Sequence, residues 1–142
     1  MTKNAVKLEN LKLAKKQAAD LNGAREAAID ATHAAALATY NKLIAVAKEY
    51  FDSISAPCED GFPEDGEPQW DANEAAYAKL VAARTAYHAA CDAHAETIFN
   101  NFDFEVAIEA GTPVADAIEA EKTTYAAMVK AARKVVEELA AK

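Results

Sequence analysis

Glycine and proline are scarce in this sequence, with four residues of each among 142. Collagen-like and glycine-rich chains are thereby excluded, because both need far more of these residues. No apolar run approaches the roughly 20 residues that a membrane-spanning helix needs. Residues 1–4 also lack the apolar segment of a secretory signal. We therefore expect one soluble domain over residues 1–142 that has no membrane partner.

Cysteine is nearly absent as well, since the sequence holds only Cys58 and Cys91. The first falls in a predicted loop and the second in a predicted helix, which does not resemble a disulfide framework. Two free thiols are typical of a reducing compartment. We expect the protein to be cytoplasmic.

The usual catalytic motifs are missing. Glycine stands only at positions 23, 61, 66 and 111, so the chain has neither a phosphate-binding loop nor a dinucleotide fingerprint. Serine occurs only at 53 and 55, outside any nucleophile elbow. Neither His88 nor His94 has a glutamate three residues before it, as the di-iron sites of helical bundles require. We expect a protein that is not an enzyme and needs no cofactor.

Alanine is what the sequence has in excess. It fills 37 positions, whereas Leu, Ile, Val and Phe together fill 27, so the 52% apolar fraction overstates the available core. Alanine favours helix but contributes little apolar area on burial. The composition predicts long helices around a thin core.

Three helices are predicted, over residues 4–55, 72–110 and 113–140. The first contains no proline and only Gly23, which leaves open whether it breaks there. Residues 56–71 hold three prolines and two glycines and are predicted to be an acidic loop. Asp71 with Glu74 forms an acidic cap for the second helix. Gly111, Thr112 and Pro113 are typical of a stop and restart, with Thr112 as N-cap and Pro113 at the first helical position.

The apolar pattern also predicts how the helices pair. In the first helix a stripe that includes Ile29, His33 and Tyr40 repeats at helical spacing, and Leu37, Ile44 and Phe51 widen it. An antiparallel hairpin around the acidic loop matches like with like in five layers: Ile29 with Ile98, His33 with His94, Tyr40 with Tyr87, Val46 with Val81, and Tyr50 with Tyr77.

A second antiparallel alignment, around the turn at Gly111, predicts that the third helix ends opposite residues 83–85 of the second helix. The segment from Tyr40 to Tyr87 then projects as a two-helix arm, on the order of 20 Å long at ~1.5 Å per residue. The expected fold is therefore all-α: an elongated antiparallel three-helix bundle with a projecting arm and alanine-rich, coiled-coil-like packing.

Charge is concentrated in the middle of the chain. The formal net charge is −8, and residues 51–121 hold 16 acidic and only 2 basic side chains. Such a block repels nucleic acid and anionic lipid. It is either a solvated loop or a docking surface for a basic partner.

The arm has faces that no third helix covers, yet it is rich in aromatic residues, which anchor protein interfaces. Phe62 and Trp70 either bind a partner or fold back to close the end of the hairpin. We expect self-association as well, through an N-terminal seam formed by Leu8, Leu11, Ala14, Ala18 and Leu21. The residues predicted to bind a partner are Tyr50, Phe62, Glu64, Asp65, Glu67, Trp70 and Tyr77.

Two polar groups suggest other functions. His33, Cys91 and His94 are zinc-compatible ligands, although a buried polar layer that fixes the register explains them equally well. Arg84 with Tyr40, Tyr87 and His88 could form a pocket for an anionic small molecule, but an arginine at a bundle edge also extends its charge into solvent.

The leading hypothesis is a non-enzymatic protein-interaction module that binds through its acidic aromatic arm. One alternative is an acidic mimic of nucleic acid that inhibits a basic host protein. The other is a helical bundle that binds a small ligand or a metal.

Overall fold

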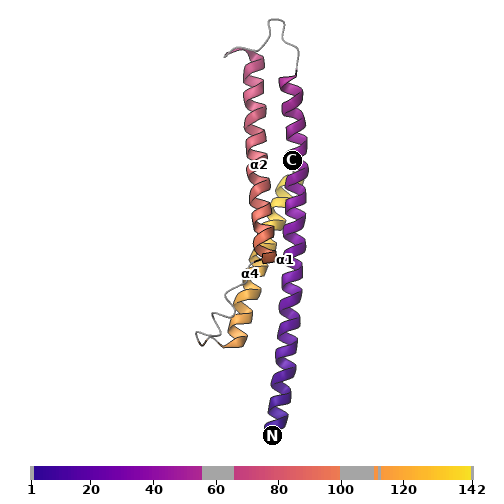
Figure 1. Ribbon diagram of the computed structural model, residues 1–142, viewed down its shortest axis with the longest axis vertical. Helices are drawn as coiled ribbons and strands as arrows, with labels where there is room; N and C mark the ends of the chain where they lie inside the picture. Colours follow the sequence, from indigo (N-terminus) through magenta and orange to yellow (C-terminus); the bar gives the residue numbers. More distant parts are fainter. Residues whose placement is uncertain (1, 56–65, 100–110, 112, 142) are drawn as a thin grey trace.

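The computed structural model describes residues 2–55, 66–99, 111 and 113–141, with side chains described throughout except at 6–11, 13–15, 17, 18 and 114. Over these ranges all regular secondary structure is helical, as predicted (Figure 1). The helices are α1 (Lys3–Ile54), α2 (Pro68–Phe99) and α4 (Val114–Ala140). No helix in these ranges is long and apolar enough to cross a bilayer.

Helix α1 is one continuous helix that runs through Gly23 without a break. Its N-terminus is capped by Thr2, whose hydroxyl accepts a hydrogen bond from the amide of Ala5 at 3.2 Å. At the other end the amide of Ser55 bonds to the carbonyl of Phe51 at 3.0 Å. The predicted bounds, 4–55, agree to within one residue.

Helix α2 begins earlier than predicted. The expected loop was to reach residue 71, but the helix starts at Pro68, and the amide of Asp71 already bonds to the carbonyl of Glu67 at 3.1 Å. A proline fits the first turn of a helix, because its fixed φ is helical and the amide hydrogen it lacks has no partner there. Trp70 therefore lies in a helix and not in the loop. The predicted continuation over 100–110 lies outside the described residues.

The start of α4 follows the predicted glycine stop. Gly111 has a φ of +92°, a left-handed conformation that favours glycine. Pro113 occupies the N-cap position and not the first helical position, since the helix begins at Val114. The predicted N-cap, Thr112, lies outside the described residues.

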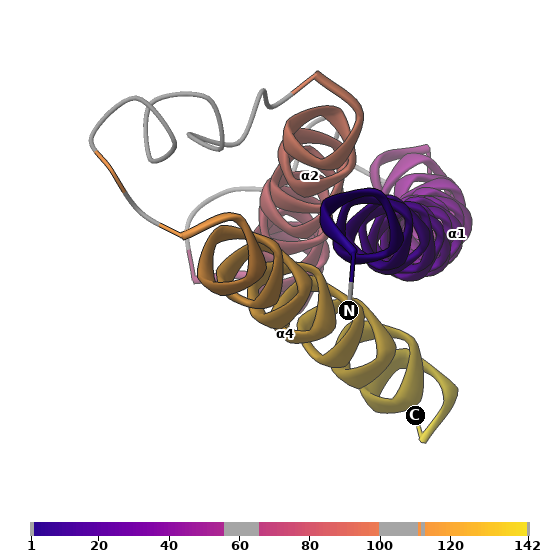
Figure 2. The ribbon, with the colours of Figure 1, turned by 90° about the horizontal axis from the view of Figure 1, so that it is seen from below.

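Helix α1 is the centre of the packing. It contacts both α2 and α4 extensively, whereas α2 and α4 contact each other little. Figure 1 shows α1 and α2 side by side, continuing past the C-terminal end of α4. Figure 2 shows α4 on one side of the α1–α2 pair, so the other side of the pair is left uncovered by α4.

Three aromatic contacts confirm the predicted register of α1 and α2. The ring centroids of His33 and His94 are 5.4 Å apart. Those of Tyr40 and Tyr87 are 5.6 Å apart, and those of Tyr50 and Tyr77 are 5.7 Å apart. These three layers span most of the hairpin, so the pairing holds along its length.

The core is made of small side chains, as the alanine content predicts. Ala28, Ala35 and Val46 on α1 are at most 3% exposed. Thr32 and Thr39 are fully buried beside them, and each hydroxyl donates to a carbonyl one turn earlier in its own helix, at 2.8 and 2.9 Å. The threonines therefore fill the core without leaving an unpaired polar group, and small residues keep the helices close.

Enlarging a core alanine tests this packing. We expect Ala28→Leu to destabilise the fold by about 1–3 kcal/mol, because Ala28 is 0% exposed and extra methylenes there force its neighbours apart. Ala127→Leu, at an exposed position of α4, is the matched control and leaves stability nearly unchanged. Urea unfolding followed by circular dichroism measures both. Equal midpoints for the two variants would contradict a tightly packed alanine core.

Candidate interaction surface

Large apolar side chains lie on the outside of α1. Five of them are 45–62% exposed, and half-buried Ala47 falls between them at the same helical spacing. The successive spacings of three and four residues are those of a coiled-coil seam. We call this set the α1 stripe: Leu37, Tyr40, Ile44, Ala47, Phe51 and Ile54.

Three residues of the α1 stripe, Leu37, Ile44 and Phe51, face away from the core, whereas Tyr40 lies at its edge and contacts Tyr87 of α2. Val46, which is 3% exposed, marks the buried face of the same stretch of α1. At roughly 100° per residue, Ile44 points about 160° away from Val46. Leu37 and Phe51 lie one heptad on either side of Ile44 and share its direction. The expectation that these three residues widen the packed face is therefore wrong.

Aromatic rings continue from the stripe towards α2. Tyr50 contacts Phe51 within α1 at 6.0 Å between ring centroids, and it also contacts Tyr77 of α2. Tyr77 is 51% exposed. The structure thus brings together Tyr50 and Tyr77, two of the predicted partner-binding residues, beside the stripe.

Two of the other predicted partner-binding residues, Trp70 and Glu67, lie at the start of α2. Trp70 is half-buried in the first turn of α2, and Glu67 is exposed just before it. Phe62, Glu64 and Asp65 lie outside the described residues, so neither their contact with a partner nor their role as a plug can be placed.

A polar network that the sequence analysis missed joins the ends of α1 and α2. The Gln69 amide donates to the carbonyl of Ser53 at 2.8 Å and to Oδ1 of Asn73 at 3.0 Å. The Ser53 hydroxyl also donates to Oδ1 of Asn73, at 2.5 Å. The network fastens the two helices where the stripe ends. Ser53, Gln69 and Asn73 are polar residues at half-buried positions, and this pattern in the sequence could have indicated the network.

The predicted metal candidates form part of the helix seam. Nδ1 of His94 shares a hydrogen bond with the Thr32 hydroxyl at 2.9 Å, and the ring of His33 lies against that of His94. Cys91 is half-buried one turn before His94. Within the described ranges, no group of three or more His, Cys, Asp or Glu side chains is placed to hold a metal ion.

The predicted ligand pocket is assembled in part. Tyr87 contacts both Tyr40 and His88, with ring centroids 5.6 and 6.1 Å apart. A hydrogen bond with Cys91 and the charge of that side chain raise the pKa of Tyr87, and burial and Tyr40 add to the rise. Arg84 is exposed on α2. The three rings thus form a contiguous cluster at the α1–α2 seam.

A second missed group links all three helices. Arg25 of α1 donates to the carbonyl of Ile98 in α2 at 3.4 Å, and its charge also acts on Glu121 of α4. Burial raises the pKa of Glu121, while a hydrogen bond from the Tyr125 hydroxyl and the charge of Arg25 oppose that rise.

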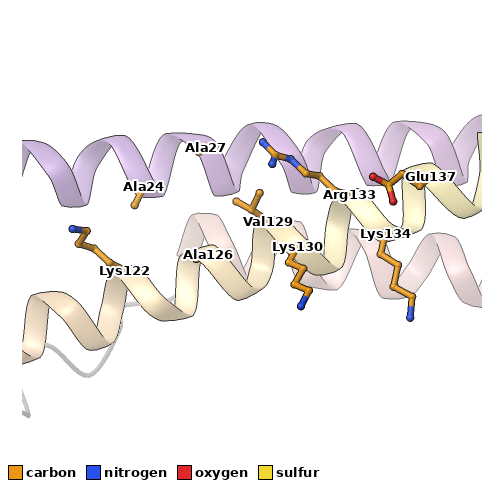
Figure 3. Close-up of a pocket in the computed structure, with 9 residues that line it drawn as sticks. All are labelled: Ala24, Ala27, Lys122, Ala126, Val129, Lys130, Arg133, Lys134 and Glu137. Carbon is orange, nitrogen blue, oxygen red and sulfur yellow. The ribbon is translucent and has the colours of Figure 1, made fainter.

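A groove of about 710 Å³ runs between α1 and α4, shown in Figure 3. Its floor is apolar, formed by Val129 and three alanines. Lys122 and Arg133 are directed towards α1 in this view, whereas Lys130 and Lys134 extend away from it. Lys122 and Lys134 pair with Glu119 and Glu138 of the same helix at 3.3 and 3.8 Å, and Glu137 also lines the groove, so much of its positive charge is balanced locally.

No protein-family model, curated protein or solved structure matches this chain.

Neutralising Glu121 tests the group of Arg25, Glu121 and Tyr125 that links the three helices. The folded-state pKa of this carboxyl lies above its ordinary value of 4.5, so folding favours the protonated form and the penalty grows as pH rises through the raised pKa. We expect Glu121→Gln to stabilise the fold at about pH 7, by less than about 1 kcal/mol because the group is partly solvated, and to change little at about pH 4.

Thermal unfolding of the variant and the parent at both pH values measures this difference. Glu74→Gln, at an exposed position of α2, is the control and has no such pH-dependent effect. A destabilised Glu121→Gln variant at pH 7 would contradict the account, because it would make the attraction of Arg25 larger than the cost of burial.

Proposed function

We propose that this protein is a non-enzymatic protein-interaction module that binds a helical partner through the α1 stripe. The observation that carries the proposal is the heptad spacing of Leu37, Ile44 and Phe51, which are 52–62% exposed and point away from the buried face of α1. Contiguous exposed apolar patches usually mark binding surfaces. A helical partner fits this pattern, because seams of three- and four-residue spacing pack against another helix.

The shape of the molecule supports this assignment. Figure 1 shows α1 and α2 continuing past the end of α4; we propose that this part is the two-helix arm, and most of the α1 stripe falls on it. Tyr50 and Tyr77 extend the apolar surface from α1 onto α2, which gives a partner two helices to contact. Aromatic side chains in such positions are typical anchors of protein interfaces.

The acidic residues beside the arm set the charge of the partner. Glu67, Asp71 and Glu74 are exposed around the first turns of α2, and the predicted contacts Phe62, Glu64 and Asp65 precede them in sequence. Opposite charge speeds association more than it adds affinity. We therefore propose a partner with a basic patch beside its apolar seam. Nucleic acid is disfavoured by the same charge.

Self-association through the N-terminal seam is a further part of the proposal. Leu21 is half-buried, and the other seam residues, from Leu8 to Ala18, lie in α1 where the side chains are not described. Figure 1 shows this N-terminal part of α1 extending past α2 and α4, which leaves it accessible to a second chain.

Site-specific photo-crosslinking tests the proposed surface. A benzophenone amino acid at Phe51 is expected to form a discrete covalent adduct with a protein in the source cell. The same group at Ala127, exposed on α4, is the control and is expected to form none. An adduct at neither position, or equal adducts at both, would contradict the assignment of the stripe as the binding surface.

Once the partner is captured, charge reversal distinguishes residues that speed association from residues that slow dissociation. We expect Glu67→Lys, Asp71→Lys and Glu74→Lys together to slow association and to weaken its dependence on salt, with little change in the dissociation rate. Phe51→Ser is expected to speed dissociation by roughly tenfold or more, because it removes an apolar anchor. Stopped-flow kinetics at two salt concentrations measures both. A charge-reversed variant that mainly dissociates faster, or a Phe51→Ser variant that mainly associates more slowly, would contradict these roles.

A further inference from the structure

We infer that the protein that covers the α1 stripe is a second copy of this chain in antiparallel orientation. The inference rests on the proposed apolar contact of the stripe and names its occupant. It takes the place of the basic partner proposed above, because residues 36–55 of a second copy carry no net charge. It uses a surface different from the N-terminal seam, and the pattern of residues, the distribution of charge and the available area all support it.

The stripe is complementary to itself. Its spacings of three, four, three, four and three residues read the same in both directions, so two antiparallel copies align every layer around one twofold axis. Leu37 then meets Ile54 of the second copy, and Tyr40 meets Phe51. Ile44 meets Ala47, so the one small residue of the stripe lies opposite a large one. In a parallel pair Ala47 would face Ala47 and leave a gap.

Charge favours the antiparallel arrangement too. Residues 36–55 hold Lys42, Lys48, Glu49 and Asp52, which sum to zero, so the contact face itself carries no net repulsion. The strongly acidic segment follows it in the chain. Antiparallel copies place the two acidic ends roughly 30 Å apart at ~1.5 Å per residue, well beyond the screening length of about 8 Å. A parallel pair would bring them together.

The exposed area is sufficient for a specific interface. The five large side chains of the stripe are 45–62% exposed. Two of the five are aromatic, a class that buries roughly 150–250 Å² per side chain, and three are smaller aliphatic residues; with about half of each exposed, they offer on the order of 400–500 Å² per copy. Two copies then bury on the order of 1,000 Å², the size at which specific interfaces begin. A reversible dimer in the micromolar range is the expected assembly.

Light scattering across a range of concentrations tests the dimer. The chain that carries Leu8→Ser and Leu11→Ser, which remove the N-terminal seam, is expected to approach twice the parent mass of 15.1 kDa as concentration rises, and the full chain to exceed it. Ile44→Ser with Phe51→Ser is expected to weaken the dimer by roughly 100-fold with unchanged helix content, since each change removes an apolar anchor. The matched control is Phe99→Ser, which alters a 78% exposed ring off the stripe and leaves the dimer intact. Leu8→Ser with Leu11→Ser tests the N-terminal seam in the same way.

A monomer at all concentrations would overturn the inference, as would a dimer lost only through the Leu8 and Leu11 changes. Neither result decides the proposed function, which the crosslinking experiment tests separately. A different protein captured at Phe51 would support the proposed function while the inference of a dimer fails. If Phe51 captures nothing, the proposed function fails as well.

Spin labels report the orientation of the two copies. A label at Ser55→Cys, with Cys58→Ser and Cys91→Ser removing the native thiols, is expected to give a distance of roughly 30 Å within the dimer, from ~1.5 Å of rise per residue. A parallel pair would give roughly 10 Å, the spacing of adjacent helices, and would overturn the antiparallel assignment.

Discussion

The register of α1 against α2 is the constraint on which the rest of the structure depends. The core between these helices is made of alanine and threonine, which pack closely but do little to distinguish one alignment from another. The ring pairs of His33 with His94, Tyr40 with Tyr87, and Tyr50 with Tyr77 supply that distinction. A slip of one residue would separate all three pairs, so they fix which faces of α1 remain outside.

The thin core leads directly to the proposed function. Small side chains hold the helices together, while the larger apolar ones, Leu37, Ile44 and Phe51, face outward. Helix α4 covers only one side of the α1–α2 pair and leaves the outer face of α1 open (Figure 2). Three exposed apolar side chains that cost solubility and contribute little to the fold are best explained by a partner that buries them.

Much of the fold could be predicted from the sequence, because helix periodicity and the matching of like residues are local signals. The hairpin register followed from pairing Tyr40 with Tyr87 and Tyr50 with Tyr77. The start of α2 was missed because Pro68 looks like a loop residue in sequence and yet suits the first turn of a helix. The site was predicted less well. The outward direction of Ile44 depends on which face of α1 packs inward at Val46, and the link from Arg25 to Glu121 joins helices whose contacts no sequence pattern marks.

Hydroxyl-radical footprinting of Phe51, read by mass spectrometry as the protein is concentrated, tests the central claim most directly. It compares the exposure of this ring before and after association, with Phe99 as the internal reference. The account predicts that Phe51 is readily oxidised in dilute solution and becomes protected on association, while Phe99 stays reactive. Phe51 that is protected at every dilution, or that stays fully reactive in the associated protein, would contradict it.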